Sequence, residues 1–575
     1  MGQLAPRLLD GLIRKGRTSG SGPARGWFAG SAAALVSVGS SAAGISVDDP
    51  DWSLRWDNTI KLSAMARVAK ADGALADSTR LLVPGVSSSA FPQALNFNAG
   101  DDNFRRRGLV SERVDLLSEF DAVYQRRFGV RLSGAGWYDA AYHRNSDAVD
   151  PLNGQTPENR FPKHTREMAG GKAELLDAFV FGAWELEGGR RLSARLGQHA
   201  LQYGESLFYG DNGIARAQGP IDVAKLLASP NAQFKEIIRP VPQVSAQLQL
   251  SADVSVGAYY QFQWESDRLP AAGSYFSTVN VPWGSSQPEY INVSSGALAG
   301  QYVLKADRLV EPSNSGQYGM QVKWRAADTD LGVYLARYHD KSGQLYGDLN
   351  VAAPQDSRWF YVFPAAVKTV GASASHSFGD VNLAGEASLR WDMPLRSQNI
   401  LYPSALSPQP AYATGKTAHI NLSWLATLGP NWLANESSFV GELAWHRVLS
   451  RHDPDHELDP ARSRDATALQ FVFSPSYRQV LPGVDLSVPV GLRYTLDGHS
   501  PVIPWESRGS GSASLGLEGN YLGVWQFTLN YTRYIGSAVP FLDYRALLSG
   551  GSTFYSRGNP LADRDYVAVS LRRTF

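Results

Sequence analysis

The chain has 575 residues, of which 54 are basic and 54 are acidic, and it contains no cysteine. A formal charge of zero argues against a general binder of nucleic acid or other polyanions, and the lack of cysteine excludes disulfides and thiolate metal sites. A soluble chain of this length would form roughly three or four domains, yet no linker and no change of composition divides the residues after 43.

An export signal is predicted at residues 1–43. Basic side chains between Arg7 and Arg25 precede an apolar stretch at 27–38, and small residues suited to cleavage follow at 41–43. No other segment approaches the roughly 18 continuous apolar residues of a transmembrane helix. The chain is therefore divided into a signal peptide, 1–43, and one further domain, 44–575.

Residues 52–68 alternate with a period of two. Trp52, Leu54 and Trp56 fall on an apolar face, and Arg55 and Asp57 fall on the other. Strands in soluble sandwiches have about 5 to 6 residues, whereas a tilted membrane-spanning strand needs about 9 to 11 and often projects further. This segment therefore predicts a transmembrane β-strand.

Similar segments recur to the end of the chain and give about 18 strands in all, with 16 as the alternative count. They lie at 110–124, 129–142, 174–187, 191–203, 242–251, 253–265, 316–326, 330–340, 366–378, 381–392, 416–428, 436–449, 464–476, 484–497, 511–521, 523–535 and 564–575.

The connections between these segments alternate between short and long. Short turns such as 187–190 and 379–380 separate long polar segments, and no repeat of about 40 to 50 residues indicates a β-propeller. The predicted fold is all-β: one transmembrane antiparallel β-barrel with short periplasmic turns and long extracellular loops. The long segments are 69–109, 143–173, 204–241, 266–315, 341–365, 393–415, 450–463, 498–510 and 536–563.

The last segment alternates up to Phe575. Outer-membrane barrels end in this way, on a closing strand whose final aromatic residue is read by the barrel-assembly machinery. Arg573 is an exception on the apolar face, where its long stem could snorkel to the bilayer interface. We expect this segment to pair with residues 52–68 and to close the barrel.

Several segments resemble a known family. They are WSLRWDNTIKLSAMARV at 52–68, AELLDAFVFGAW at 173–184, RLGQHALQYGES at 195–206, PIDVAKLLASPNAQFKE at 220–236 and YYQFQWESDRLPAAGSYFS at 259–277. The family is the Gram-negative group catalogued as domain of unknown function 1302. The resemblance implies an outer-membrane barrel in contact with outer-membrane lipid, often accompanied by a periplasmic lipid-binding-like partner and sometimes by an inner-membrane exporter.

The polar faces of the first strands carry charges of both signs. If the apolar faces meet lipid, the polar faces line the lumen, where mixed charge indicates either a water-filled selective path or salt bridges that brace the wall. Both interpretations stay open. The candidates for lumen and selectivity residues are Arg55, Arg113, Asp115, Glu119, Asp177, Arg195, His199 and Glu205.

The segment 204–241 is the candidate constriction. Apolar residues follow Asp222 at roughly helical spacing, with Asp222 as a plausible helix cap. An 18-stranded barrel is too wide for its own side chains to fill, so this helix either folds inward and narrows the pore or lies outside on the surface. The candidate constriction residues are Asp222, Lys225, Leu226, Phe234 and Lys235.

Evidence for other chemistry is weak. His452, Asp453, Asp455 and His456 crowd one long loop with ligand types suited to a cation, but a solvated loop explains them better, and neither a metal site nor a cofactor is expected. No G-x-S-x-G or H-E-x-x-H motif follows residue 43. We expect no enzyme, but a channel or transporter for a small amphipathic or hydrophobic molecule in the outer membrane of a Gram-negative bacterium. The alternatives are an outer-membrane hydrolase and a structural or adhesive surface barrel.

Overall fold

A computed structural model of the chain describes thirteen ranges of residues. Residues 1–42, which hold all but the last residue of the predicted signal peptide, lie outside them. Within the described ranges, no helix is long and apolar enough to cross a membrane. The ranges are 43–45, 49–76, 99–148, 159–229, 234–279, 289–293, 299–306, 309–397, 401–403, 412–452, 458–503, 505–543 and 554–575.

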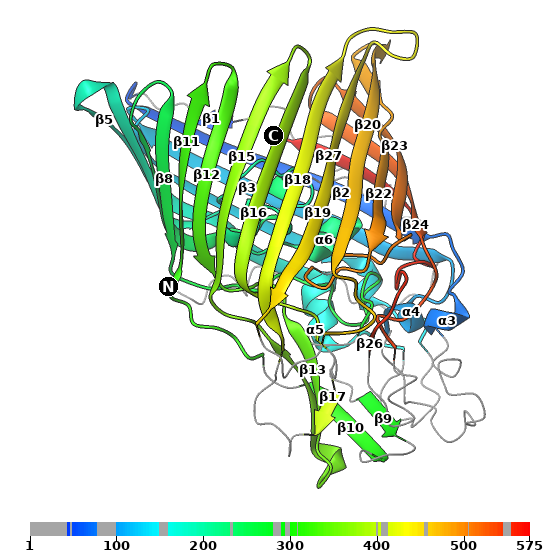
Figure 1. The fold of residues 1–575 in the computed structure, drawn as a ribbon. Helices are drawn as coiled ribbons and strands as arrows, with labels where there is room; N and C mark the ends of the chain where they lie inside the picture. Colours follow the sequence, from blue (N-terminus) through cyan, green and yellow to red (C-terminus); the bar gives the residue numbers. More distant parts are fainter. Residues whose placement is uncertain are drawn as a thin grey trace. The chain divides into compact units, whose positions relative to one another are not determined.

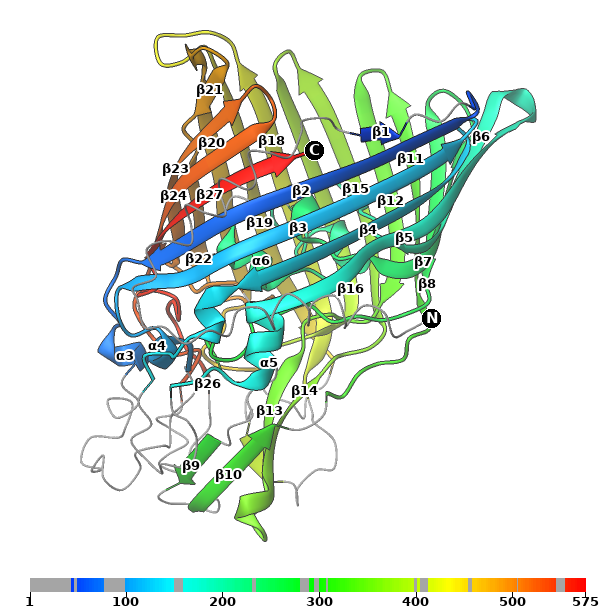
Figure 2. The same cartoon turned by 180° about the vertical axis from the view of Figure 1, so that it is seen from behind.

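Eighteen strands of the described chain form a closed antiparallel barrel (Figures 1 and 2). We count β21 and β22 as one strand, because both pair with β20 and with β23. The predicted fold class and strand count are confirmed. The strands are β2 (Trp52–Arg67), β3 (Gly108–Tyr124), β4 (Phe128–Asp139), β5 (Gly171–Leu186), β6 (Arg190–His199), β7 (Val241–Gln249), β8 (Val254–Gln261), β11 (Gln317–Ala326), β12 (Thr329–Tyr338), β15 (Val367–Phe378), β16 (Val381–Pro394), β18 (Thr414–Leu428), β19 (Glu436–Arg451), β20 (Asp465–Leu481), β21 (Val484–Ser487), β22 (Val490–Gly498), β23 (Gly511–Tyr521), β24 (Trp525–Ile535) and β27 (Tyr566–Thr574).

The barrel closes between its last and first strands, as predicted. β27 pairs with β2 from Thr574 opposite Thr59 to Tyr566 opposite Arg67, and it pairs with β24 on its other side. Arg573 lies on the outward face, where its guanidinium sits 4.9 Å from the ring centre of Trp525. This cation–π contact gives the exceptional arginine a partner on the apolar face.

The two faces of the wall differ as the alternating pattern predicts. On β16, Leu383 and Leu389 are exposed outward, whereas Glu386 and Arg390 are buried on the inward face. The same alternation places Leu116 outward and Asp115 inward on β3. An exterior of exposed leucine, valine and aromatic side chains is the surface that a lipid-facing barrel needs.

Short turns join the strands at one end of the barrel. The turn from Tyr124 to Arg127 has positive φ angles at Gln125 (48°) and Arg126 (57°), and the Arg127 amide donates to the Tyr124 carbonyl at 3.0 Å. Two consecutive residues with positive φ are the geometry of a type I′ hairpin, whose twist suits antiparallel strands.

The long connections lie at the other end and contain structure that the sequence analysis missed. The segments 266–315, 341–365 and 393–415, which were expected to be polar loops, contribute to a separate five-stranded sheet in the order β17-β13-β14-β10-β9. These strands are β9 (Glu289–Val293), β10 (Gly300–Ala306), β13 (Gln344–Leu349), β14 (Ser357–Val362) and β17 (Leu401–Pro403).

The helices and the remaining short strands are brief. They are β1 (Ala43–Ile45), α3 (Gly73–Ala76), α4 (Ala99–Asn103), η4 (Ala140–His143), α5 (Lys163–Thr165), η5 (Arg166–Gly170), η6 (Glu187–Gly189), η7 (Ile214–Ala217), α6 (Val223–Ala228), α7 (Phe234–Ile237), η8 (Pro354–Asp356), β25 (Leu542–Asp543) and β26 (Phe554–Tyr555).

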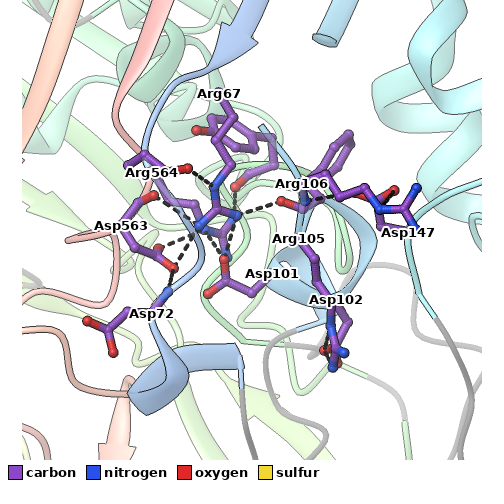
Figure 3. A network of polar contacts seen from close by, with 12 residues as sticks. Arg67, Asp72, Asp101, Asp102, Arg105, Arg106, Asp147, Asp563 and Arg564 are labelled. Atoms are coloured by element: carbon purple, nitrogen blue, oxygen red, sulfur yellow. Dashed lines mark hydrogen bonds and ion pairs between the residues drawn. The ribbon is translucent and has the colours of Figure 1, made fainter. Parts of the chain in front are cut away.

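A buried cluster of four charges joins the ends of the two seam strands (Figure 3). Arg67, the last residue of β2, donates to Asp101 of α4 at 2.9 Å and to Asp563 at 2.7 Å. Arg564, two residues before β27, reaches Asp101 at 2.9 Å. We refer to these four side chains as the seam cluster; they are at most 4% exposed. Removing one member would leave the buried charges of this cluster unbalanced, which is far more destabilising than losing a surface ion pair.

Candidate functional site

Residues 200–229 and 234–240, between β6 and β7, fold into the barrel, and we call them the inward segment. They include η7, α6 and α7. Both views place α6 within the ring of strands (Figures 1 and 2), and side chains on the inward faces of β16, β18 and β19 bond to this segment. For the described residues of the segment 204–241, the inward alternative therefore describes the structure.

Glu442 of β19 holds the start of the inward segment. Its Oε2 atom accepts the backbone N–H groups of Leu207, Phe208 and Tyr209 at 3.1, 2.5 and 2.8 Å. Its Oε1 atom accepts the hydroxyl of Ser206 at 2.8 Å. The Glu442 side chain is fully buried, so these charge-assisted bonds replace its water.

A second pair of wall residues, on β16, holds the next turn. Glu386 accepts the backbone N–H groups of Glu205 at 2.6 Å and Ile214 at 2.9 Å. Arg390 donates to the carbonyls of Asn212 at 2.6 Å and Gly213 at 2.8 Å. The wall therefore provides an acceptor for free amides and a donor for free carbonyls, which an irregular segment needs when it is shielded from water.

Asn212 fits between two histidines of the wall. Its amide nitrogen donates to the carbonyl of Trp445 at 3.1 Å and to Asn421 Oδ1 at 2.7 Å, which fixes the orientation of the carboxamide. Its oxygen lies 2.8 Å from His419 Nδ1 and 3.1 Å from His446 Nδ1. Because this oxygen can only accept, both histidines carry a proton on Nδ1.

The inward segment also reaches the opposite side of the barrel. Arg268, in the connection after β8, donates to Glu174 on the inward face of β5 at 2.9 Å and to Asp222 of the inward segment at 2.9 Å. β5 lies almost half way round the ring from β18. The segment thus spans the lumen from wall to wall.

A further buried cluster ties the segment to the long-loop end. Arg216 of η7 pairs with Asp267 at 2.9 Å and Asp340 at 2.6 Å. The pKa of the neighbouring Lys341 is lowered to about 7. Burial is the larger cause, and the positive charge of Arg216 is the second. The amine of Lys341 therefore titrates near neutral pH and not near its ordinary value.

The wall of β3, β4 and β5 carries charges that water still reaches. Arg131 pairs with Glu119 at 2.5 Å, with Asp121 at 3.2 Å and with Asp177 at 3.5 Å, and these four side chains remain 25 to 33% exposed. Glu442, on the far wall, is not exposed at all. The inward segment thus covers the wall of β16, β18 and β19 and leaves the charged wall open to solvent.

The predicted lumen residues fall into two groups. Arg113, Asp115, Glu119 and Asp177 share the inward face of β3 to β5, where Arg113 pairs with Asp115 at 2.6 Å. The members of this group combine salt bridges with exposure to water, so the two interpretations of the charged wall are compatible.

The other predicted lumen residues lie outside that group. Arg55 is 69% exposed and pairs with Asp57. Arg195 lies over the ring of Phe179, at 5.7 Å from its centre, and Glu205 of the inward segment pairs with Lys323 at 3.0 Å.

His199 corrects the expectation of a solvent-lining charge. The side chain is fully buried, and its ring bonds to the hydroxyl of Ser245 at 2.8 Å and to the carbonyl of Gly197 at 3.0 Å. It is a structural residue at the end of β6.

The predicted constriction residues have different positions in the inward segment. Asp222 caps α6, with Oδ1 accepting the Lys225 amide at 2.9 Å, as expected. Phe234 is buried in an apolar cluster inside the segment, and the partly buried Leu226 packs against the same cluster. Lys225 and Lys235 are exposed.

The proposed cation ligands are largely outside the described residues. Asp453, Asp455 and His456 lie there, and His452 is 3.9 Å from Asp392. Among the described residues, no group of three or more His, Asp or Glu side chains has a geometry suited to a metal ion.

The sequence analysis missed the anchors on the far wall. Each of the four anchors occupies an inward position of an alternating strand, but all the predicted lumen residues come before residue 206. The anchors are Glu386, Arg390, Asn421 and Glu442. The polar residues in the middle of β16, β18 and β19 were the only feature of the sequence that could have indicated these anchors. Without knowledge of the inward segment, they could not be distinguished from ordinary lumen residues.

Comparisons with known proteins give a family and a set of distant structural likenesses. The family model described as "Protein of unknown function (DUF1302)" matches residues 25–575, and no curated protein matches the chain.

Three of the similar solved structures share little sequence with this chain. The outer membrane channel DcaP of Acinetobacter baumannii is 9% identical, with 93% of this chain and 100% of that chain covered and a TM-score of 0.35. OccAB2 of the same organism is 9% identical, with 91% and 98% covered and a TM-score of 0.39. An anion-selective porin from Comamonas acidovorans is 12% identical, with 91% and 100% covered and a TM-score of 0.33.

Proposed function

Since the chain belongs to the DUF1302 family, whose description names no activity, we propose a function from its geometry: an outer-membrane channel for small amphipathic molecules, narrowed by the inward segment. The short turns then face the periplasm and the long connections face outward. The outward apolar face is suited to outer-membrane lipid.

The contrast between the two inner walls is the observation that carries this proposal. Side chains on β16, β18 and β19 are sealed by the inward segment, whereas Glu119, Asp121, Arg131 and Asp177 stay about a quarter to a third exposed. A barrel of this strand number is too wide to be filled by its own side chains. A water-filled path along the charged wall accounts for the exposure of these charges and for the lumen space that the side chains leave unfilled.

Mixed charge along one side of a path favours dipolar or amphipathic solutes over simple ions. Fixed charges of both signs orient a dipole, and a low-dielectric wall strengthens their field. The periplasmic lipid-binding-like partner and the inner-membrane exporter rest on the family resemblance alone. They remain predictions about how the channel is supplied.

Planar bilayers test this function. We expect purified, folded protein to give discrete current steps that bilayers with detergent alone do not give. Silent bilayers, from a preparation whose folded state is verified by its heat-modifiable gel mobility, would contradict the channel.

A surface-binding barrel is the second candidate, since the long connections build an ordered five-stranded sheet. This alternative predicts silent bilayers with the fold intact. Silence together with ester hydrolysis would instead favour the hydrolase.

A further inference from the structure

A group of cations gathers where the seam of the barrel faces α6. Lys61 points inward from β2, with Arg572 of β27 directly opposite on one side and Asp115 of β3 directly opposite on the other. Arg113 is opposite Ser63, one inward position further along β3. Cβ atoms of directly opposed residues are about 4.5 to 5.5 Å apart, so these charges share one small area of wall.

The inward segment adds a fourth cation. Leu227 of α6 packs in the same apolar cluster as Met65 of β2 and Ala568 of β27, so this helix lies against the seam. Lys225, on the same helix, is an electrostatic neighbour of Lys61, as are Arg113 and Arg572. We call Lys61, Arg113, Lys225 and Arg572 the basic patch.

The basic patch has too few nearby carboxylates to neutralise its four cations. Asp115 is already paired with Arg113, and Glu518 of β23 is the acid on the other side of Arg572. No ion pair or hydrogen bond between described residues involves the amine of Lys61. The remaining cations bond to neutral groups: Arg572 to the Gln526 amide and Lys225 to a backbone carbonyl at 2.7 Å.

Like charges held together in a partly desolvated place repel one another, and a bound anion relieves that repulsion. Lys61 is half-buried as a residue, and its amine is not sealed from solvent. Lys225 and Arg572 are exposed. A solute anion can therefore reach the cations.

Apolar side chains flank the basic patch on its long-loop side. Met65, Leu227, Phe276 and Ala568 are partly buried and in contact with a larger aromatic cluster. An alkyl chain can lie against these side chains while its charged end meets the cations. The site therefore has one polar and one apolar part.

We propose that the basic patch binds the carboxylate of an amphipathic organic anion, with the alkyl part along Met65, Leu227 and Ala568. This inference rests on the proposed channel function and specifies its substrate class. The structure favours an anion because Lys61, Lys225 and Arg572 form no ion pair with a carboxylate among the described residues, whereas the charges around Arg131 are already paired.

The test uses the full chain in planar bilayers with decanoate as the probe. Decanoate is expected to block the current, and neutral decanol and cationic decyltrimethylammonium at the same concentration are expected to block it far less. Lys61→Gln combined with Arg572→Gln should raise the half-blocking concentration of decanoate at least tenfold, and Lys61→Arg should keep it near the original value.

The matched control is Arg478→Gln, which removes one exposed cation that pairs with Glu436 at the short-turn ends of β19 and β20, away from the strands of the basic patch. We expect it to leave the block by decanoate unchanged. Equal block by all three probes, or a half-blocking concentration that the double variant does not change, would overturn the anion site while the channel stands. An absence of current from every folded variant would overturn the channel itself and the site with it.

Discussion

At the scale of the residue, two buried carboxylates determine where the inward segment lies. Glu442 and Glu386 together accept five backbone N–H groups of that segment. A hydrogen bond to a charged group contributes about 1.5 to 3 kcal/mol. The position of the segment therefore depends on a few wall residues far away in the sequence.

Replacing Glu442 should loosen the constriction. In Glu442→Ala, three backbone amides, the Ser206 hydroxyl and the Asn421 side-chain amide lose an acceptor, so we expect a larger single-channel conductance and more open-channel noise. The control is Glu436→Ala, at the exposed end of the same strand, which should leave the currents unchanged. An unchanged conductance in a folded Glu442→Ala protein would show that this anchor does not set the width of the path.

Replacing Arg131 should change the ion preference. Arg131 is the cation shared by Glu119, Asp121 and Asp177. Arg131→Gln therefore leaves three carboxylates without their shared cation at a wall that water reaches. The reversal potential in a salt gradient should then shift towards cations, while Arg478→Gln, at the short-turn end of β20 and away from Arg131, should not move it. A reversal potential equal to that of the unmodified protein would mean that permeating ions do not pass this wall.

The sequence predicted the charged wall better than it predicted the anchors. Alternation alone was enough to place Arg113, Asp115 and Glu119 on one inward face. It could not show that His199 would be buried, because burial there depends on hydrogen bonds to Ser245 and Gly197. Nor could it show that Glu442 would bind amides from a segment more than two hundred residues earlier.

At the scale of the element, the strands were predictable because each carries its own pattern. The long connections were not predictable, since the five-stranded sheet pairs β10 with β14 in parallel and β13 with β17 across long separations in the chain. Strand pairings between distant segments leave little pattern in the local sequence from which the sheet could be predicted. The helix after Asp222 was predictable from its cap and its spacing, whereas its inward position depended on contacts with distant strands.

The tip of the inward segment can be removed without straining the rest. Ile221 and Ile238 form an antiparallel bridge, and the Arg239 amide donates to the Pro220 carbonyl at 2.8 Å, so the two ends already meet. Replacing residues 222–237 by two glycines should raise the single-channel conductance severalfold, because α6 and α7 are lost and the anchors at Glu386 and Glu442 stay.

A matched insertion separates this effect from general damage. Two glycines inserted after Gly379, in a short turn, should leave the conductance unchanged. If the shortened protein conducts like the original, α6 and α7 do not narrow the path.

At the scale of the whole molecule, closure of the barrel joins residues from both ends of the chain. β2 and β27 meet along the seam, and the seam cluster joins their long-loop ends through Asp101 of α4 (Figure 3). The pattern of each strand predicted that the ends would pair. The seam cluster was not predicted, because its members come from three separate segments of the chain.

Breaking the seam cluster should weaken the barrel. Asp101→Asn removes the carboxylate shared by Arg67 and Arg564, and losing one partner of a buried ion pair costs about 3 to 5 kcal/mol. The temperature at which the folded band shifts on a gel should fall by several degrees. Asp102→Asn, whose half-exposed partner is Arg105, should cause little change, and an equal effect of the two variants would contradict a role for the seam cluster.

The central claim is that a water-filled path runs along one inner wall of this barrel. The chain has no cysteine, so single cysteines can be labelled without background, and Thr59 and Ile60 are neighbours on opposite faces of β2. A charged, water-soluble thiol reagent added during recording should reduce the single-channel current of Thr59→Cys and leave that of Ile60→Cys unchanged. A reagent that affects neither current, or both alike, would contradict the claim.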